Sequence, residues 1–358
     1  MKIAIVGFGL EGQAAYEYWH TEGNEITICD QNTDVSLMDD VTSQTGPDYL
    51  RGLEQFDVVV RSPFVHPDLV KAAGDKVTSN MNEFLRVCPT RQIIGITGTK
   101  GKGTTSTLIA KMLEAAGRRV HIGGNIGIPA LELLKNDIQP EDWVVLEMSS
   151  FQLIDLKQSP HIGVCLMVVP EHLDWHPDIN EYTEAKSNLF RHQAEEDIAV
   201  YFAGNELAEL IASHGQGRKL PYFAAPGATV SGGEIAIGNH LICKTDELKL
   251  LGRHNWQNAC AAITTVWQIV PEIEPLRDVL TAFTGLEHRL ELVREVGDVK
   301  YYNDSFGTTP ETATVALEAF SEPKVLILGG SDKGAKYDSL ARAVAEGNVR
   351  QVILIGNQ

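Results

Sequence analysis

Short apolar runs alternate with helical stretches over residues 1–87. The runs KIAIVGF, EITICD and DVVVRS have the length and the β-branched content of strands. After the first run, a helix is predicted near Gly12–Glu22. Because strands that alternate with helices form parallel sheets, these residues are expected to fold as an α/β domain.

The same alternation continues over residues 88–285. An apolar strand at Gln92–Thr97 leads into a glycine-rich loop, and a helix is predicted from about Thr104 to Gly117. Further strands are predicted at Trp143–Glu147 and Ile162–Val169. Residues 226–252 combine glycines with short alternating runs and are expected to form hairpins.

A third segment begins near residue 286. Its predicted order is strand VKYYND, helix Glu311–Phe320, strand KVLILGG, helix Tyr337–Glu346 and strand QVILIG. A doubly wound sheet normally has five or six strands, so three are few. The C-terminal part of this domain is therefore expected to be missing from the sequence.

Composition narrows the class of protein. The chain has 358 residues, of which 43% are hydrophobic, and a formal net charge of −18. This charge disfavours binding to nucleic acid or to anionic membranes, so an anionic substrate must be held by local donors and metal ions. The five cysteines are far apart and predict neither a disulfide framework nor a zinc site. With no signal peptide and no apolar run of about 20 residues, a cytoplasmic protein is expected.

The first chemical signal is the loop GFGLEG, between a strand and a helix. Its glycines, Gly7, Gly9 and Gly12, allow backbone amides to approach a phosphate at a helix N-terminus. Asp30 ends the second strand, where an acid can accept from a ribose or a base. A nicotinamide-dependent oxidoreductase is the obvious interpretation, but any pyrophosphate suits this geometry, and a turn without ligand is a further alternative.

A stronger signal is the loop in IGITGTKGKGTT. Backbone N–H groups of such a loop cradle phosphate oxygens, and Lys102 is placed to reach the β- and γ-phosphates. A hydroxyl of Thr104 or Thr105 is expected in a Mg²⁺ shell. The loop departs from the strict P-loop pattern, because Ile96 replaces its first glycine and Gly103 follows the lysine.

Two acidic motifs follow later strands. Glu147 ends the strand WVVL, the position of a Mg²⁺ ligand in nucleotide-hydrolysing folds. The motif EHLDWH holds His172 and His176 four residues apart. Pro170 before them and the missing glutamate of HExxH argue against a zinc helix. Taken alone, this stretch would be a surface loop with two histidines.

In this order, the motifs resemble the Mur ligases over essentially the whole chain. GGNIGIPAL, EMSSFQL and EHLDWH are most similar to the D-glutamate-adding members. The resemblance implies an α/β, three-domain architecture: a Rossmann-like UDP-sugar domain (1–87), a central P-loop ATPase domain (88–285) and an incomplete Rossmann-like ligase domain (286–358). It also implies ATP-dependent addition of D-glutamate to UDP-N-acetylmuramoyl-L-alanine through an acyl phosphate, a step of peptidoglycan precursor synthesis. The enzyme is expected to be a cytoplasmic monomer. The GFGLEG loop would then hold the UDP diphosphate.

The resemblance further implies roles for individual residues. The implied catalytic residues are Lys102 at the ATP phosphates and Glu147, His172 and Lys186 at the metal. Thr104 joins them as metal ligand, two Mg²⁺ ions are implied, and Lys186 is expected to be carbamylated, which makes it carboxylate-like. The implied ATP contacts are Gly98, Thr99, Lys100, Gly101, Lys102, Gly103, Thr104, Thr105, Asn255, Asn258, Arg289 and Asp304. The implied substrate contacts are Gly9, Leu10, Glu11, Asp30, Asn125, Ser149, Gln152 and Lys333, the last at the incoming amino acid.

Some positions depart from the family pattern. Phe306 and Thr309 stand where the family has lysine and asparagine, and Met167 replaces an asparagine upstream of the histidine. The GKGTT loop is more similar to folylpolyglutamate synthase, although that family lacks the N-terminal glycine-loop domain. Other Mur ligases and a UDP-sugar-binding protein without ligase activity remain alternatives. An oxidoreductase is the weakest alternative, because that function would leave the phosphate-binding loop around Lys102 unexplained.

Overall fold

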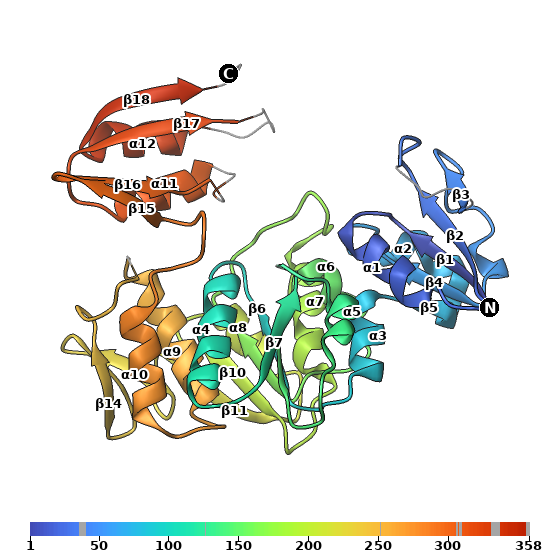
Figure 1. Cartoon of the computed structure of the whole chain (residues 1–358), viewed down its shortest axis with the longest axis horizontal. Coiled ribbons are helices and arrows are strands. Elements are labelled where there is room, and N and C mark those ends of the chain that lie inside the picture. The colour runs from blue at the N-terminus through green and yellow to red at the C-terminus, as the bar shows by residue number, and fades with distance from the viewer. Residues whose placement is uncertain are drawn as a thin grey trace. The chain divides into compact units, whose positions relative to one another are not determined.

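The computed structural model describes residues 1–35, 41–125, 127–250, 252–305, 307, 310–330 and 337–355 (Figure 1). The chain divides into two units. The first comprises Met1–Thr245 with Trp256–Leu280, and the second comprises Asp246–Asn255 with Thr281–Gln358. Within the described ranges, three sheets lie in the first unit and two in the second.

Five parallel strands form the sheet closest to the N-terminus, in the order β3-β2-β1-β4-β5. The apolar residues 3–6 of central β1 are fully buried, as expected for an inner parallel strand. The predicted alternation is confirmed, although the first helix covers Leu10–Trp19 and not Gly12–Glu22. The elements are β1 (Lys2–Val6), α1 (Leu10–Trp19), β2 (Glu25–Asp30), β3 (Thr42–Thr45), η1 (Leu53–Gln55), β4 (Val58–Arg61), α2 (Pro67–Val70), η2 (Lys71–Lys76), β5 (Val77–Thr78) and α3 (Asn80–Val87).

A second parallel sheet has six strands in the order β11-β10-β9-β6-β8-β7. Every residue of β6 and β8 is buried, which explains their continuous apolar sequences. Because these strands are parallel, the loops at their carboxyl ends share one edge of the sheet. The elements are β6 (Ile93–Thr97), α4 (Lys102–Ala115), β7 (Val120–Gly124), α5 (Ala130–Leu133), η3 (Leu134–Asn136), β8 (Trp143–Glu147), α6 (Ser150–Leu153), β9 (Ile162–Cys165), α7 (Ile179–Arg191), β10 (Ile198–Phe202), α8 (Glu206–Ala212) and β11 (Arg218–Tyr222).

Among the described residues of the first unit, antiparallel pairing is confined to the segment predicted to form hairpins. There β12 (Ala228–Ser231), β13 (Glu234–Ile237) and β14 (His240–Lys244) form a three-stranded sheet, which confirms that prediction. Two helices follow, α9 (His254–Val266) and α10 (Ile273–Ala282). No helix in the described part of the chain is long and apolar enough to cross a membrane.

The second unit contains the predicted strand–helix–strand–helix–strand order and one additional strand. Strand β15 (Glu291–Val296) pairs antiparallel with β16 (Val299–Asn303). The second unit therefore contains two separate two-stranded sheets in place of the expected single sheet. The sequence ELVREV carries three charges and lies mostly exposed, which explains why its pattern did not predict a strand. The other elements are α11 (Pro310–Glu318), β17 (Lys324–Gly329), α12 (Asp338–Glu346) and β18 (Val349–Ile355), with β17 and β18 parallel.

Candidate active site

The loop between β6 and α4 has the geometry of a phosphate cradle. Gly98 and Gly101 adopt φ of +146° and +88°, which side chains rarely tolerate. A Cβ on Gly98 would lie 2.6 Å from Leu166 Cβ, and one on Gly101 would lie 2.3 Å from Asn258 Oδ1. The loop then leads into the 14-residue helix α4, and the first N–H groups of a helix can bind an anion. Glycine is therefore required on steric grounds at both positions.

Two lysines converge on one carbonyl of this loop. Lys102 Nζ lies 3.1 Å from Gly98 O, and Lys186 Nζ, from α7, lies 3.2 Å from the same oxygen. Lys186 is 2% exposed and also donates to Thr97 Oγ1 at 3.3 Å. Burial, and then the charge of Lys102, lower the pKa of Lys186 to about 7. A buried amine that is partly neutral near pH 7 thus lies beside a phosphate loop.

Glu147 lies at the same edge of the sheet. It ends β8, pairs in register with Ile96 of β6 and is 4% exposed. Its Oε1 accepts a hydrogen bond from Asn125 Nδ2 at 2.8 Å. A Cβ on Gly124 would lie 2.3 Å from the Glu147 carbonyl oxygen, so glycine permits β7 to approach β8 this closely. The predicted acid and the predicted amide are therefore brought together.

The loop of Glu171–His176 lies beside α6. His172 has a left-handed backbone (φ 58°), and its ring centroid lies 4.9 Å from that of Phe151. Its side chain is 45% exposed, whereas His176 is fully buried. The interpretation of this stretch as a surface loop is therefore wrong for His176. Among the described residues, no three His, Cys, Asp or Glu side chains form a metal-binding group.

The N-terminal glycine loop contacts the motif EMSSFQ through Glu11. Its Oε1 accepts from Gln152 Nε2 at 2.5 Å, and its carbonyl accepts from Asn80 Nδ2 at 2.7 Å. Burial raises the pKa of Glu11 to about 7, against the lowering effect of the Gln152 hydrogen bond. Ser149 and Gln152 form a capping box at the start of α6. Both oxygens of Asp30 accept backbone N–H groups, Phe8 N at 2.6 Å and Asn32 N at 2.8 Å.

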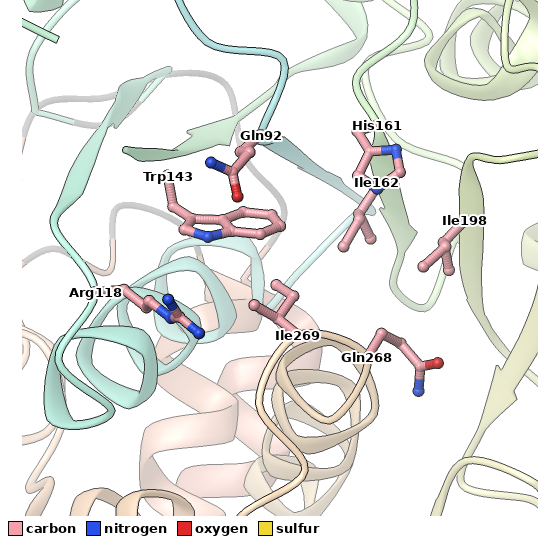
Figure 2. Close-up of a pocket in the computed structure, with 8 residues that line it drawn as sticks. All are labelled: Gln92, Arg118, Trp143, His161, Ile162, Ile198, Gln268 and Ile269. Atoms are coloured by element: carbon pink, nitrogen blue, oxygen red, sulfur yellow. The ribbon is translucent and has the colours of Figure 1, made fainter. Parts of the chain in front are cut away.

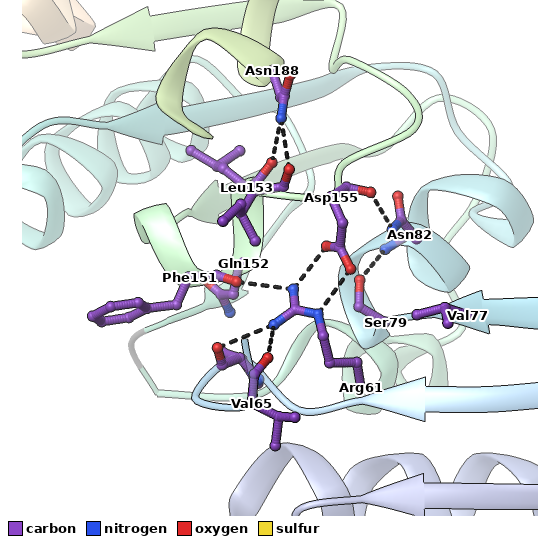
Figure 3. A network of polar contacts seen from close by, with 12 residues as sticks. Arg61, Val65, Val77, Ser79, Asn82, Phe151, Gln152, Leu153, Asp155 and Asn188 are labelled. Carbon is purple, nitrogen blue, oxygen red and sulfur yellow. Dashed lines mark hydrogen bonds and ion pairs between the residues drawn. The ribbon is translucent and has the colours of Figure 1, made fainter. Parts of the chain in front are cut away.

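A buried arginine, which the sequence reasoning missed, joins the five-stranded sheet to α6 (Figure 3). Arg61 ends β4, is 1% exposed and donates to both oxygens of Asp155 at 2.8 and 2.7 Å. Its Nη2 also donates to Phe151 O at 3.0 Å. Asp155 O in turn accepts from Asn82 Nδ2 at 2.9 Å. An arginine that directly follows the apolar run DVVV was the one signal available for this network.

A cavity of 340 Å³ lies at the opposite edge of the six-stranded sheet (Figure 2). Trp143, Ile162 and Ile198, the first residues of β8, β9 and β10, line it together with Arg118. None of the residues that line it belongs to the predicted site. The cavity is therefore separate from the phosphate loop, which follows the carboxyl end of β6.

Comparison with known proteins identifies the family. Residues 96–266 match the Mur ligase middle domain, and residues 288–358 match the Mur ligase, glutamate ligase domain. The chain is 36% identical to the UDP-N-acetylmuramoylalanine--D-glutamate ligase of Clostridium tetani, over 99% of this chain and 81% of the relative. The corresponding Ruminiclostridium cellulolyticum protein is also 36% identical, over 99% of this chain and 80% of the relative. The chain belongs to the Mur ligase family.

Solved Mur ligase structures share the fold. MurF from Acinetobacter baumannii aligns with a TM-score of 0.62 at 17% identity, over 93% of this chain and 72% of that chain. The UDP-N-acetylmuramate-alanine ligase MurC from Thermotoga maritima aligns with a TM-score of 0.59 at 18% identity, over 99% and 85%. The α/β Mur ligase fold expected from the sequence is confirmed.

The remaining predicted site residues of this Mur ligase fall into four groups. Near the phosphate loop, Thr105 is fully buried with its Oγ1 3.4 Å from Asn258 Oδ1, and Thr104 is 6% exposed. At the start of α1, Leu10 is 74% exposed and Gly9 is the N-cap. Asn255, Arg289 and Asp304 lie in the second unit, where Leu290 N donates to Asp304 Oδ1 at 3.0 Å and burial raises the pKa of Asp304. Lys333 lies outside the described residues, as do Phe306 and Thr309, the two positions that depart from the family pattern.

Proposed function

We propose that this Mur ligase uses ATP to join D-glutamate to UDP-N-acetylmuramoyl-L-alanine through an acyl phosphate. The observation that carries the proposal is the convergence of Lys102 and Lys186 on the Gly98 carbonyl, with Glu147 on the neighbouring strand. Its substrates are those named for the relatives at 36% identity. The carboxylate of the nucleotide sugar takes the γ-phosphoryl group, and the amine of the amino acid then displaces phosphate.

The phosphate loop is the proposed ATP site. Its two steric glycines leave room for phosphate oxygens beside the backbone, and Lys102 offsets their negative charge. The hydroxyl and carboxylate oxygens of Thr104 and Glu147 are the ligands that Mg²⁺ prefers, so the residues present fit a magnesium site. Bound Mg²⁺ supplies positive charge that stabilises phosphoryl transfer. Lys102, Thr104 and Glu147 hold and orient the reacting groups.

Lys186 is proposed to be carbamylated. Its lowered pKa of about 7 leaves a substantial fraction of the amine neutral, and only a neutral amine adds CO₂. The neutral nitrogen forms a bond to the carbon of CO₂ as one C=O π bond breaks, and it then loses one proton, so the amine becomes an anion; counted from the ammonium form, two protons are released. That anion would join Glu147 and His172 as a metal ligand. Loss of CO₂ from the carbamate requires return of a proton to the nitrogen, and the buried position of Lys186, 2% exposed, limits its delivery from solvent.

The N-terminal glycine loop is the proposed site of the UDP diphosphate. Gly9 has no atom within 4 Å of where its Cβ would lie, which leaves its backbone open to a ligand. Glu11 of the same loop is hydrogen-bonded to Gln152, so this domain contacts the motif that follows Glu147. Asn125, Ser149 and Gln152 would then face the sugar-peptide end of the substrate.

Phosphate release tests the reaction. ATP, Mg²⁺ and UDP-N-acetylmuramoyl-L-alanine are supplied with one amino acid at a time. Release that depends on D-glutamate is expected, and release that is the same with and without an amino acid would contradict ligation. Lys186→Ala should lower kcat about 100-fold or more, with partial recovery in added short carboxylates. The exposed Lys111 of α4 provides the control variant, Lys111→Ala, which should keep full activity.

A further inference from the structure

Four side chains form a hydrogen-bonded chain between the start of α2 and the start of α6. Ser150 Oγ lies 3.0 Å from His176 Nε2, and His176 Nδ1 lies 2.9 Å from Glu181 Oε1. The same Glu181 oxygen lies 3.2 Å from Nε2 of His66, which caps α2 in the N-terminal part of the chain. We name these four residues the imidazole relay. It connects segments 115 residues apart in the sequence.

The partners of the relay fix its hydrogen positions. His66 Nδ1 accepts from Asp68 N at 3.3 Å, so a neutral His66 carries its hydrogen on Nε2 and donates to Glu181. A carboxylate only accepts, so His176 carries its hydrogen on Nδ1. Its Nε2 then accepts from the hydroxyl of Ser150. Burial lowers the pKa of His176, against the raising effect of Glu181, which favours this neutral form.

The centre of the relay is enclosed by rings. His176 has no exposed surface, and the Phe151 ring lies parallel to it, with centroids 5.8 Å apart. Tyr182 meets the imidazole edge-on at 5.4 Å. A serine, histidine and acid in this order can activate a nucleophile. Ser150 is only 2% exposed, however, so a substrate carbonyl cannot reach its hydroxyl. The geometry therefore favours positioning over nucleophilic attack.

The relay ends on α6, where two of the proposed substrate contacts, Ser149 and Gln152, also lie. Ser150 is the first residue of α6, Ser149 is its N-cap, and Gln152 closes the capping box. The N-terminal part of the chain thus contacts α6 through Glu11 to Gln152 and through His66 and the relay to Ser150, in addition to the Arg61 hydrogen bond to Phe151 O. A hydrogen bond at the first turn fixes the direction in which Ser149 and Gln152 point.

We infer that His176 is a positioning residue, which orients the first turn of α6 so that Ser149 and Gln152 bind the nucleotide-sugar substrate. This inference rests on the proposed function and adds residues that the family resemblance did not assign. His176 itself touches neither substrate nor metal in this assignment. Its removal should therefore weaken binding of the nucleotide sugar and leave the KM for ATP unchanged.

A double-mutant cycle tests the relay. His176→Asn keeps a donor for Glu181 but cannot reach Ser150, and Ser150→Ala removes the other partner of the same hydrogen bond. The affinity for UDP-N-acetylmuramoyl-L-alanine is measured by calorimetry, which needs no turnover. Each variant should bind about tenfold more weakly, the loss expected for one hydrogen bond. Because both remove one interaction, the double variant should also lose about tenfold and not about 100-fold.

His121→Asn is the matched control. His121 is also buried and bonded to a carboxylate, Asp142 at 2.9 Å, but it lies near the start of β7, away from α6. The His121→Asn variant should bind both substrates with the affinity of the wild type. His176→Gln, whose carbonyl can reach Ser150, should recover part of the affinity. Ser150→Ala removes only one hydroxyl, so a folded variant remains for the test if a change at the enclosed ring prevents folding.

The outcomes separate the inference from the proposed function. The relay would be overturned if both single variants bind the nucleotide sugar like the wild type, or if the double variant loses about 100-fold in affinity. Neither result would affect the proposed function, provided that the wild type still ligates D-glutamate. A wild type that binds the nucleotide sugar but never ligates would overturn the proposed function. In that case the variant affinities still decide whether the relay orients α6.

Discussion

The pH dependence of stability provides a direct test of the buried amine of Lys186. Its pKa falls from 10.5 to about 7 on folding, because of burial and the charge of Lys102. Between these two values the unfolded chain binds a proton that the folded chain does not. The free energy of unfolding should therefore rise with pH in this window, by up to about 1.4 kcal/mol per pH unit. Below pH 7 both states are protonated, and the dependence ends.

Lys186→Met removes the titration and keeps most of the side-chain volume. With pKa values of 10.5 and about 7, the lysine costs about 4 kcal/mol at pH 7 and about 2 kcal/mol at pH 9. The stability gained by Lys186→Met over the wild type should therefore shrink by about 2 kcal/mol between these pH values. The variant also loses the hydrogen bonds to Gly98 and Thr97, which shifts its free energy of unfolding by the same amount at every pH. The difference in stability gain between pH 7 and pH 9 is therefore unaffected.

Urea unfolding at pH 7, 8 and 9 measures this difference. The buffers are free of bicarbonate, so that no carbamate forms on the lysine. Other titrating groups contribute equally to both proteins and cancel in the comparison. Lys111→Met, on the exposed face of α4, is the control and should run parallel to the wild type. A Lys186→Met curve that is also parallel to the wild type would refute a lysine poised near neutrality.

Three further changes test other parts of the structure. Arg61→Met leaves Asp155 without its partner and should lower the free energy of unfolding, measured in urea, by about 3 kcal/mol. This value is the low end for a broken buried pair, because the Asp155 side chain is 18% exposed. A loss below about 1 kcal/mol would contradict the prediction. Gly101→Ala places a Cβ 2.3 Å from Asn258 Oδ1 and should raise the KM for ATP about tenfold or more, with nucleotide-sugar affinity unchanged. Glu147→Gln should lower kcat about 100-fold in the phosphate-release assay with far-UV circular dichroism unchanged, and activity like the wild type would exclude Glu147 from the site.

The sequence predicted those elements whose own residues are apolar. Strand β8 has the predicted bounds, Trp143–Glu147, because all five residues are buried and the run is continuous. Helix α4 begins at Lys102, two residues before its predicted start, because the helix forms directly from the phosphate loop. Strand β15 was missed, because its pairing with β16 leaves most of its residues exposed and its sequence charged.

The candidate site could be proposed from the sequence where one local motif contains the chemistry. The phosphate loop with Lys102, and Glu147 at a strand end, are such motifs. The Arg61 network and the imidazole relay were not predictable, because their partners lie 94 and 115 residues apart and no local pattern connects them. His176 illustrates the limit, since its stretch after Pro170, taken alone, was interpreted as a surface loop, whereas tertiary packing buries His176 completely.

The chain as a whole is acidic, whereas two lysines meet at the phosphate loop, where the proposed carbamate on Lys186 would replace a cation by an anion. A net charge of −18 offers no attraction for ATP, and fields beyond about 8 Å are screened at physiological salt, so binding depends on groups at the loop itself. Lys102 and the start of α4 provide that local positive potential. Among the described residues, however, no three acidic, histidine or cysteine side chains gather there to hold a metal. A carbamate on Lys186 would supply the missing anion next to Glu147, and the amine is buried where its pKa of about 7 permits that reaction.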